Sequence, residues 1–329
     1  MISLSIIIPC FKRVQQTLKT INLLLQSEGI DNRYKAEFIA ADSSPDDELK
    51  LALQKEFGGK IIFTRPEKPG IATNKNQGAK IAQNPILIFC DSDMEVEKDT
   101  IKNTISALQR HKNAAAVGGQ VIWRGGSKHG QHDRPRAEDR MLKIEQTTYV
   151  EVLYSRYIGT YKEVFLNVDG YDEVIFNMRG EGSDLSVRYW RAGYPLIYNE
   201  DIVVHHVYDA PDAVAVRVAH QEWAIAKDLF LLIYKYDILG QNYKNFIRTV
   251  AANFSPLGDM GYYEILQGLV QHYDFICKVK PYLDDQKSKM KSIYNFKFLE
   301  IFSRKELLNL CIKEAESRLL KIRKQSFHE

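Results

Sequence analysis

Two aspartates, Asp91 and Asp93, directly follow the unbroken apolar run Ile86–Cys90. A run of this kind is typical of a strand that is buried on both faces, as in parallel sheets. Ligands of open α/β sheets bind beyond the carboxyl ends of the strands, and residues two apart in an extended segment point to the same side. Carboxylate oxygens suit hard divalent cations, so we expect both aspartates to bind one such ion. An Asp-rich turn without a ligand is the alternative, which this short motif alone does not exclude.

The elements before this motif alternate between strands and helices. Apolar runs bounded by turn residues predict the strands, and apolar residues at helical spacing predict the helices. The predicted order is a strand at 4–9, a helix at 12–26, a strand at 36–41, a helix at 49–57, a strand at 60–64, a helix at 73–83 and the strand before Asp91. This alternation predicts an α/β fold with a doubly wound, Rossmann-like, mostly parallel sheet. Phe11 and Asp42 follow two of its strands, so they should share one sheet edge with Asp91 and Asp93.

The composition of the 329 residues bounds the class of protein. Apolar residues make up 45% of the chain, which is enough for a core, and the net charge of +3 gives no reason to expect a nucleic-acid partner. The four cysteines are scattered, so neither a metal cluster nor a disulfide framework is indicated. No signal peptide is recognisable, and no segment approaches the ~20 apolar residues of a membrane span. We expect a cytoplasmic protein, with a peripheral position at the inner face of the membrane as the alternative.

Four motifs occur together in an order and spacing that resemble those of a known family. They are Ser5-Ile6-Ile7-Ile8-Pro9-Cys10-Phe11-Lys12-Arg13, Ala41-Asp42-Ser43-Ser44-Pro45-Asp46, Gly70-Ile71-Ala72-Thr73-Asn74-Lys75-Asn76-Gln77-Gly78 and Phe89-Cys90-Asp91-Ser92-Asp93. Through them the chain resembles the family 2 glycosyltransferases of the GT-A fold, strongly over 1–100 and moderately over 160–206. The resemblance implies an inverting, metal-dependent transfer of sugar from a nucleotide sugar.

The resemblance also implies roles for residues of the first half. Phe11 would stack on the nucleotide base and Asp42 would accept its imide N–H, which favours uracil. The Asp-x-Asp motif would bind Mn²⁺ or Mg²⁺ together with the diphosphate. Contacts to the nucleotide sugar are therefore expected from Pro9, Phe11, Arg13, Asp42, Lys75, Asn76, Asp91 and Ser92, and contacts to the metal from Asp91, Asp93 and His205.

The chain departs from the family pattern at two of these positions. The family often has two acidic or amide residues where Ala41-Asp42 stands, and it usually has arginine where Lys75 stands. A lysine offers charge to a phosphate without the bidentate fork of arginine. Lys75 is accordingly expected to meet the donor through its charge alone.

The second part of the resemblance lies in the segments 168–173, 179–188 and 191–195 and implies the acceptor side. A helix is expected there, with Ser183 as its N-cap and Gly193 at its end. His205 and His206 follow the next strand, at 195–204. A histidine after this strand is a metal ligand in several branches of the family, so His205 is the first choice and His206 the alternative.

The same resemblance places the catalytic base near residue 181. Relatives commonly have Glu-Asp where this chain has Glu181-Gly182, and the missing Asp is the residue usually credited as base. We expect Glu181, in a glycine-flanked loop before the helix, to take this role, with room for the sugar at Gly182. Asp184 is expected to be an orienting residue that pairs with Arg188, four positions on. Asp172 is the third candidate for the base.

Two segments carry less information. The segment 124–140 shows no periodicity and predicts a loop, either a lid over the donor diphosphate or a solvated connection, in which His129 and His132 are ordinary loop histidines. Residues 211–329 are expected to be helical, and their last part, from 271, is rich in Lys and Arg. Packing against the sheet is the plainer role for these helices, and a peripheral contact with an anionic membrane or a partner enzyme is the alternative.

The predicted organisation is a donor-binding half at 1–112 and an acceptor-binding half at 113–210 of one GT-A domain, followed by a helical extension at 211–329. The predicted function is transfer of a sugar, from UDP in particular, to a hydroxyl of a carbohydrate acceptor in surface polysaccharide biosynthesis. One alternative is a catalytically silent nucleotide-sugar-binding subunit that supports a partner transferase. A sugar nucleotidyltransferase is a further alternative, but it should carry a glycine-rich phosphate loop, and 9–13 contains no glycine.

Overall fold

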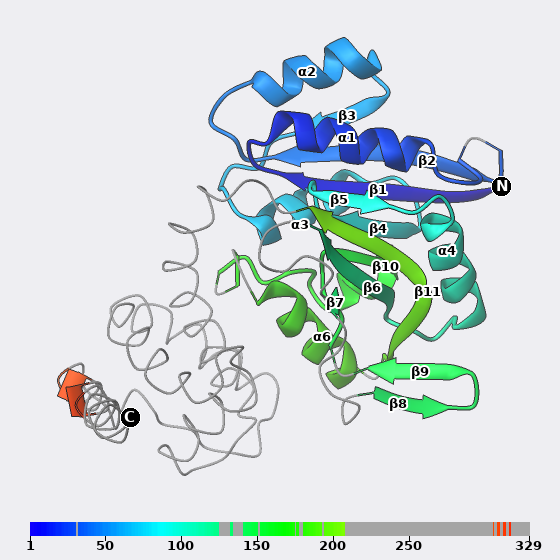
Figure 1. Ribbon diagram of the computed structural model, residues 1–329, viewed down its shortest axis with the longest axis vertical. Coiled ribbons are helices and arrows are strands. Elements are labelled where there is room, and N and C mark those ends of the chain that lie inside the picture. The colour runs from blue at the N-terminus through cyan, green and yellow to red at the C-terminus, as the bar shows by residue number, and fades with distance from the viewer. Residues whose placement is uncertain are drawn as a thin grey trace, which may run out of the picture. The chain divides into compact units, whose positions relative to one another are not determined.

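The chain divides into two units, Met1–Pro211 and Asp212–Glu329 (Figure 1). The computed structural model describes residues 1–30, 32–124, 132–133, 141–150, 152–174, 176–177, 180–192 and 194–207, together with six helical positions between 305 and 316. The expectations for 211–329, except for helix at those six positions, lie outside the described residues. Among the described residues, no helix combines the length and the apolarity that crossing a membrane requires.

The first half of the sheet is parallel, as the alternating pattern predicts. Its strands are β1 (Ile2–Cys10), β2 (Tyr34–Asp42), β3 (Ile61–Thr64) and β4 (Ile86–Cys90), in the spatial order β3-β2-β1-β4. Each pair of neighbours is parallel, because a helix returns the chain between successive strands. These helices are α1 (Val14–Leu25), α2 (Glu48–Phe57) and α3 (Ile71–Ile81). All four strands therefore end at the same sheet edge.

The second half of the sheet is mixed. Strand β10 (Tyr157–Tyr161) runs antiparallel between β4 and β6 (Ala116–Arg124), and β11 (Leu196–Val207) runs parallel to β6. The antiparallel hairpin of β8 (Met141–Ile144) and β9 (Thr147–Val150) extends the sheet beyond β11. Two short strands lie off this order: β5 (Met94–Val96) pairs with the end of β11, and β7 (His132–Asp133) pairs with β6. Strand β5 follows Asp93 directly, so the pairing brings the end of β11 to the Asp91/Asp93 turn.

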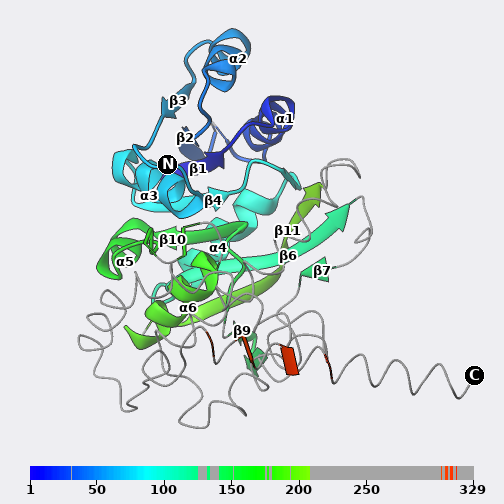
Figure 2. The same cartoon turned by 90° about the vertical axis from the view of Figure 1, so that its left-hand side faces the viewer.

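Helices cover both faces of the sheet. Alternate residues of β1 point to opposite faces, so Ile6 and Ile8 lie in one apolar cluster and Ile7 lies in the other. The first cluster is covered by α1, α2 and α4 (Thr100–Arg110), and the second by α3, α5 (Lys162–Asn167) and α6 (Glu181–Arg191). Figure 2 shows α1 and α3 on opposite sides of β1. This three-layer arrangement agrees with the predicted fold class.

One local prediction is wrong, and others lie outside the described residues. Helix α6 begins at Glu181, and the backbone N–H of Asp184 donates to the carbonyl of Gly180, so Ser183 lies inside the helix and is not its N-cap. Gly193 lies outside the described residues. Within 124–140 only Arg124 and the two residues of β7 are described, so the lid hypothesis and His129 lie outside them; of His132 only the backbone is described.

Candidate active site

The carboxyl ends of β1, β2 and β4 bring the predicted donor residues to one edge of the sheet. Phe11 and Arg13 follow β1, Asp42 ends β2, and Asp91 and Asp93 follow β4. Strand β1 lies between β2 and β4 and pairs with both, so its end separates the Asp42 side from the Asp91 side. The edge thus provides one carboxylate on one side of Phe11 and two on the other.

Asp42 has the geometry of a buried acceptor. Its side chain is fully buried, and its Oδ1 accepts hydrogen bonds from the backbone N–H (3.0 Å) and the Oγ (2.6 Å) of Ser44. Its Oδ2 has no hydrogen-bond partner, although Arg65 Nη2 lies 3.7 Å away. An unpaired buried carboxylate oxygen is costly. It is therefore a candidate to accept a hydrogen bond from a ligand.

The turn after β1 is strained and leaves Phe11 exposed. Lys12 and Arg13 have φ angles of 56° and 53°, in the left-handed region that non-glycine residues rarely adopt. The Lys12 backbone N–H donates to Ser44 Oγ at 2.7 Å, which connects this turn to the turn that holds Asp42. The Phe11 ring is 53% exposed, an unusual value for a phenylalanine. Lys12 Nζ lies 5.7 Å from the centre of this ring. The exposed ring is a candidate surface for stacking of a planar ligand.

Asp93 lies between two cationic partners. Its Oδ2 is 2.6 Å from Arg13 Nη1 and 3.3 Å from His206 Nε2. Burial acts to raise the pKa of Asp93, but the hydrogen bond and charge of His206 and the charge of Arg13 outweigh it and hold the pKa below its usual value. Asp93 is therefore ionised at neutral pH. Arg13 contacts Asp93 in this structure, and its predicted contact with the donor stays a prediction.

Asp91 lies in a different environment. The backbone N–H of Met94 donates to the carbonyl of Asp91 at 3.2 Å, so residues 91–93 form a turn and not the extended segment that the sequence predicted. The two carboxylates consequently have different partners: Asp91 Oδ1 lies 3.1 Å from Lys75 Nζ. Burial raises the pKa of Asp91 to about 6 although the charge of Lys75 opposes it, and the charges of Asp93 and Glu181 contribute to the rise.

Lys75 is the centre of a buried polar cluster. Its side chain is fully buried, and Nζ lies 2.8 Å from the carbonyl of Ser155, 3.1 Å from Asp91 Oδ1 and 3.4 Å from Glu181 Oε1. It also lies 5.3 Å from the centre of the Tyr171 ring. Its hydrogen-bond acceptors are the carbonyl and the Oγ of Ser155 and Oε1 of Glu181. Its contact with Asp91 is an ion pair without a hydrogen bond. Lys75 joins the Asp91 turn to the start of α6, and its expected contact with the donor stays a prediction.

Glu181 occupies this cluster as the first residue of α6. Its Oε1 accepts a hydrogen bond from Ser155 Oγ at 2.5 Å, and its side chain is about nine-tenths buried. Burial acts to raise the pKa of Glu181, but Lys75 and Ser155 lower it by more, so the net shift is downward. The predicted room at Gly182 is absent, because a Cβ there would lie 2.8 Å from the Cβ of Ser155. Gly182 lets Ser155 approach Glu181.

The other predicted residues are held by protein contacts. Asp184 is fully buried and pairs with Arg188 at 2.8 and 2.7 Å, as the i,i+4 spacing predicts. Asp172 accepts a hydrogen bond from the backbone N–H of Val174 (2.9 Å). Asn76 exchanges hydrogen bonds with the backbone of Tyr171 at 2.8 and 2.9 Å. These contacts fix the positions of the three side chains.

Pro9 and Ser92 were also predicted to contact the donor. Pro9 is buried in β1 opposite Ala41, and the carbonyl of Ser92 accepts a hydrogen bond from Thr20 at 2.9 Å. Both help to place their strand ends. Whether either of them touches a donor stays a prediction.

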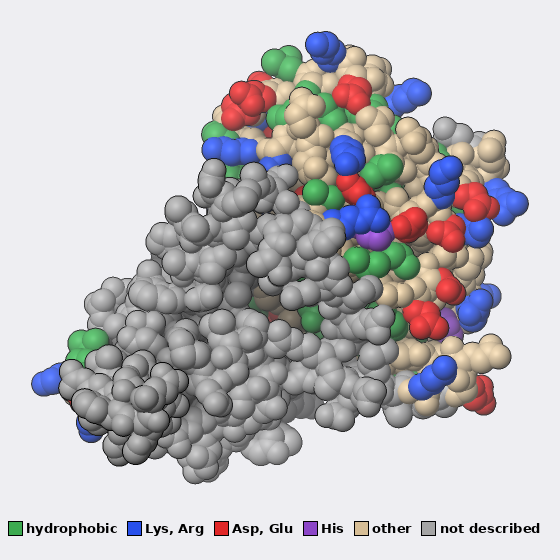
Figure 3. All heavy atoms as spheres, viewed as in Figure 1, with side chains coloured by type: hydrophobic (Ala, Val, Ile, Leu, Met, Phe, Trp, Pro, Cys, Tyr) green, Lys and Arg blue, Asp and Glu red, His purple; other side chains and the backbone are tan. Residues whose placement is uncertain are grey.

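The structure places His206, and not His205, next to Asp93. Successive residues of a strand point to opposite sides, so only one of the two side chains can face Asp93. His206 does so, and its ring packs against Trp123 with 4.3 Å between the ring centres. His205 Nε2 instead lies 2.5 Å from Glu97 Oε1. Acidic and basic side chains are interspersed on the visible surface of the first unit (Figure 3).

Three residues of the site escaped the sequence analysis. Arg65 approaches Asp42 from the end of β3, and Ser155 connects Lys75 with Glu181. Arg156 places its guanidinium 4.8 Å from the Trp123 ring centre, and its charge lowers the pKa of both Asp91 and Asp93. Arg65 follows a predicted strand, a position that signals a site. Ser155 and Arg156 lie in no recognisable motif.

The site fits a divalent cation with few protein ligands. Among the described residues, no group of three or more His, Cys, Asp or Glu side chains is arranged to hold a metal ion. Asp93 and His206 do face each other at 3.3 Å, and Asp91 lies in the same turn. Mg²⁺ is usually bound by one or two carboxylates plus substrate phosphates and water. The donor set suits such an ion, and the metal role of each residue stays a prediction.

Comparison with known proteins agrees with this architecture. The family model of glycosyl transferase family 2 matches residues 5–167. The uncharacterized glycosyltransferase YfnE of Bacillus subtilis is 31% identical over 121 residues, 36% of this chain and 30% of that protein. The probable N-acetylgalactosaminyltransferase 9 of Caenorhabditis elegans is 24% identical over 192 residues, 51% of this chain and 33% of that protein. The minor teichoic acid biosynthesis protein GgaB of B. subtilis is 22% identical over 147 residues, 43% of this chain and 16% of that protein. The chain spans a third or less of the length of each of these relatives.

Two solved structures share the fold at low sequence identity. TarS 1-349 of S. aureus has a TM-score of 0.54 at 13% identity and covers 88% of each chain. GalNAc-T7, solved with UDP, GalNAc and Mn²⁺, has a TM-score of 0.57 at 16% identity and covers 89% of this chain and 58% of that one. These similarities confirm the predicted GT-A type fold class. Through residues 5–167, this chain carries a glycosyl transferase family 2 domain.

Proposed function

We propose that this chain is an inverting, metal-dependent glycosyltransferase that moves a sugar from UDP to a hydroxyl of a carbohydrate acceptor in surface polysaccharide biosynthesis. The observation that carries the proposal is the row of carboxylates at one sheet edge, with Asp42 on one side of Phe11 and Asp91 and Asp93 on the other. The match to a minor teichoic acid biosynthesis protein supports a surface glycan as the product. Inversion is carried over from the family resemblance.

The base-binding side is the part of the site that best supports uracil. In uracil the N3–H is a donor, whereas cytosine has an acceptor at the same ring position. The unpaired Oδ2 of Asp42 matches a donor, and the exposed ring of Phe11 provides a surface for stacking. Arg65, 3.7 Å from this oxygen, has hydrogens to offer to a neighbouring carbonyl of the base.

The diphosphate side combines Asp91 and Asp93 with His206 and Arg13. In this proposal Asp93, His206 and Asp91 are the residues that would hold a Mn²⁺ or Mg²⁺ ion, which would supply positive charge to the diphosphate of the donor. Arg13 lies 2.6 Å from Asp93 and is ready to move to a phosphate oxygen once that carboxylate takes another partner.

Glu181 is the base in this proposal. The acceptor oxygen forms a bond to the anomeric carbon while the bond from that carbon to the diphosphate oxygen breaks, and the acceptor proton passes to the carboxylate. Its lowered pKa keeps Glu181 ionised before the reaction. Glu181 becomes neutral when it takes this proton. Lys75 then still has its ion pair with the carboxylate of Asp91.

The test measures the melting temperature of the full chain with UDP, in the presence of Mn²⁺ and in the presence of a chelator. We expect a clearly larger rise with Mn²⁺, because a ligand that binds the folded state stabilises it by an amount that grows with the logarithm of its concentration relative to Kd. Equal shifts in both conditions would remove the metal from the proposal. Glu181→Gln should retain the UDP shift and lower the rate of sugar transfer by about 10²–10⁴. A normal rate would remove Glu181 from the role of base.

A catalytically silent nucleotide-sugar-binding subunit is the second candidate. One observation favours it: Glu181 is held in a buried pair with Lys75, which makes it a weak base. In that case UDP binds as above, but UDP-sugars are neither hydrolysed nor transferred by the isolated protein. A panel of UDP-sugars with Mn²⁺, followed by detection of free UDP, separates the two candidates.

A further inference from the structure

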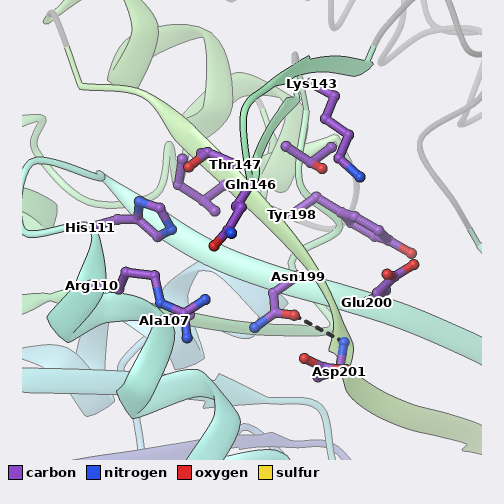
Figure 4. A pocket seen from close by; sticks show the side chains of 12 residues that line it. Ala107, Arg110, His111, Lys143, Gln146, Thr147, Tyr198, Asn199, Glu200 and Asp201 are labelled. Atoms are coloured by element: carbon purple, nitrogen blue, oxygen red, sulfur yellow. Dashed lines mark hydrogen bonds between the residues drawn. The ribbon is translucent and has the colours of Figure 1, made fainter.

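A cavity of about 460 Å³ lies on the first unit, away from the carboxylate row. It is bounded by the last turn of α4, the β8–β9 hairpin and the first half of β11 (Figure 4). The residues of β11 that line it are 197–201, whereas His206 meets Asp93 at the other end of the strand. At roughly 3.3 Å per residue, five to nine positions correspond to about 17–30 Å along the strand. The cavity is therefore separate from the proposed donor site.

The floor of the cavity is a bulge that other elements hold in place. The pairing of β11 with β6 shifts its register between Tyr198 and Val203. Gln120 and Asn103 donate side-chain hydrogen bonds to the carbonyls of Glu200 (2.9 Å) and Asp201 (2.7 Å). Bulges of this kind redirect side chains and are often found near functional sites.

Gly119 of β6 makes the bulge sterically feasible. A Cβ at this position would lie 1.9 Å from the carbonyl oxygen of Ile202 and 2.6 Å from that of Asn199. Any side chain would push the bulge away from the sheet. The bulge is thus specified by three residues outside it, namely Gly119, Gln120 and Asn103.

Both positively and negatively charged side chains line the cavity. One cation, Arg110, comes from α4 and the other, Lys143, comes from β8, while both carboxylates, Glu200 and Asp201, come from β11. The pKa of His111 is lowered by burial and by the nearby Arg110, so this ring is neutral at physiological pH. In Figure 4 the uncharged Gln146 lies between His111 and the β11 residues. The formal charges of the lining cancel.

This lining favours a ligand that is neutral and rich in hydroxyl groups. An anion would meet Glu200 and Asp201, a cation would meet Arg110 and Lys143, and an apolar ligand would leave these groups without water or partners. A hydroxyl group both donates and accepts, so it suits carboxylate, ammonium, imidazole and amide neighbours alike. The volume lies in the range of small-molecule sites.

We propose that this cavity is a second carbohydrate site, which binds a neutral sugar unit independently of the donor edge. The site goes beyond the proposed transfer reaction, because no reacting group is part of it. Lys143 and Gln146 are the residues to test, because both are exposed side chains of the β8–β9 hairpin and their removal should leave the core intact.

The test exposes the labelled full chain to an array of immobilised oligosaccharides that includes neutral, acidic and zwitterionic members, with excess UDP and Mn²⁺ present. We expect binding to neutral oligosaccharides. The double variant Lys143→Ala/Gln146→Ala should weaken it by about tenfold, because two hydrogen-bonding side chains are lost. The matched control Lys60→Ala/Gln54→Ala removes the same side-chain types from the exposed surface around α2 and should bind like the wild type.

Three outcomes would overturn the proposal: no binding to any neutral oligosaccharide, binding confined to acidic or zwitterionic ones, or neutral binding that the hairpin variant leaves unchanged. The UDP melting shift is recorded on the same samples. Loss of that shift with array binding intact would reject the donor site alone, and the reverse result would reject the cavity alone.

Discussion

Several buried side chains of this protein have polar or charged partners that the local sequence does not indicate. Asp42 has one oxygen bonded to Ser44 and one that accepts no hydrogen bond, and the ammonium of Lys75 is shared between Asp91 and Glu181. In a buried setting such groups are strongly coupled, because neither water nor counter-ions screen them. Substitutions at this scale should therefore separate ligand binding from stability.

Asp42→Asn should weaken UDP binding by about 1.5–3 kcal/mol, the magnitude of a hydrogen bond to a charged group. The amide oxygen is expected to keep the two hydrogen bonds from Ser44, which turns the NH₂ group toward the position of Oδ2. A donor would then face the N3–H of uracil. Calorimetric titration with UDP measures the loss, and Asp46→Asn, an exposed carboxylate of the same turn, is the control. Equal affinities of the two variants would exclude Asp42 from the base site.

Lys75→Met should lower the free energy of unfolding by about 3–5 kcal/mol, because it leaves two buried carboxylates without their cation. Adding Glu181→Gln removes one of these charges. The double variant should then lose clearly less than the two single losses combined, which chemical denaturation measures. Strict additivity would show that the 3.4 Å contact between Lys75 and Glu181 carries no coupling.

At the scale of elements, the pairing register of β11 with β5 decides which histidine lies next to the Asp91/Asp93 turn. Pairing of β11 with β5 places His206 opposite Met94 and His205 opposite Glu95. Strand β5 begins directly after Asp93, so the side chain of His206 reaches Asp93 in the turn. The side chain of His205 reaches Glu97. A shift by one residue would exchange the two roles.

His206→Ala should raise the Mn²⁺ concentration needed for the UDP melting shift by about tenfold or more, since even indirect partners of a metal ligand contribute 10–100-fold. His205→Ala is the matched control one position away and should leave this concentration unchanged. Titration of Mn²⁺ at fixed UDP provides the measurement. The opposite pattern would restore His205 as the ligand.

At the scale of the whole molecule, Asp91 links stability to pH. Its pKa of about 6 lies above its ordinary value of 3.8, so the folded protein binds its proton more tightly than the unfolded chain does. This contribution to stability is complete below pH ~4 and is lost as the pH rises through about 6. The cause is burial, which disfavours the ionised form.

Asp91→Asn should therefore be more stable than the wild type at pH 7 without metal, by about 1–3 kcal/mol, since a shift of one pKa unit corresponds to about 1.4 kcal/mol. The two proteins should converge toward pH 4. Denaturant titrations at pH 4, 5, 6 and 7 in a chelating buffer provide the comparison. A variant that is less stable than the wild type at pH 7 would show that the Lys75 contact outweighs the burial of Asp91.

The sequence by itself determined the features that depend on neighbours along the chain. Apolar periodicity predicted the order of β1 to β4 with α1 to α3 between them, and the strand ends predicted the shared edge of Phe11, Asp42, Asp91 and Asp93. The spacing of Asp184 and Arg188 predicted their ion pair. These inferences hold because backbone geometry and side-chain direction repeat with a fixed period in helices and strands.

Only the tertiary structure decided which distant residues meet. Lys75, Ser155 and Glu181 come from three separate segments, and nothing in their local sequence indicates that layer packing buries them together. The space expected at Gly182 is taken by Ser155 for the same reason. The roles of His205 and His206 depended on strand register, which is set by pairing with β5 and β6 and not by the histidines themselves.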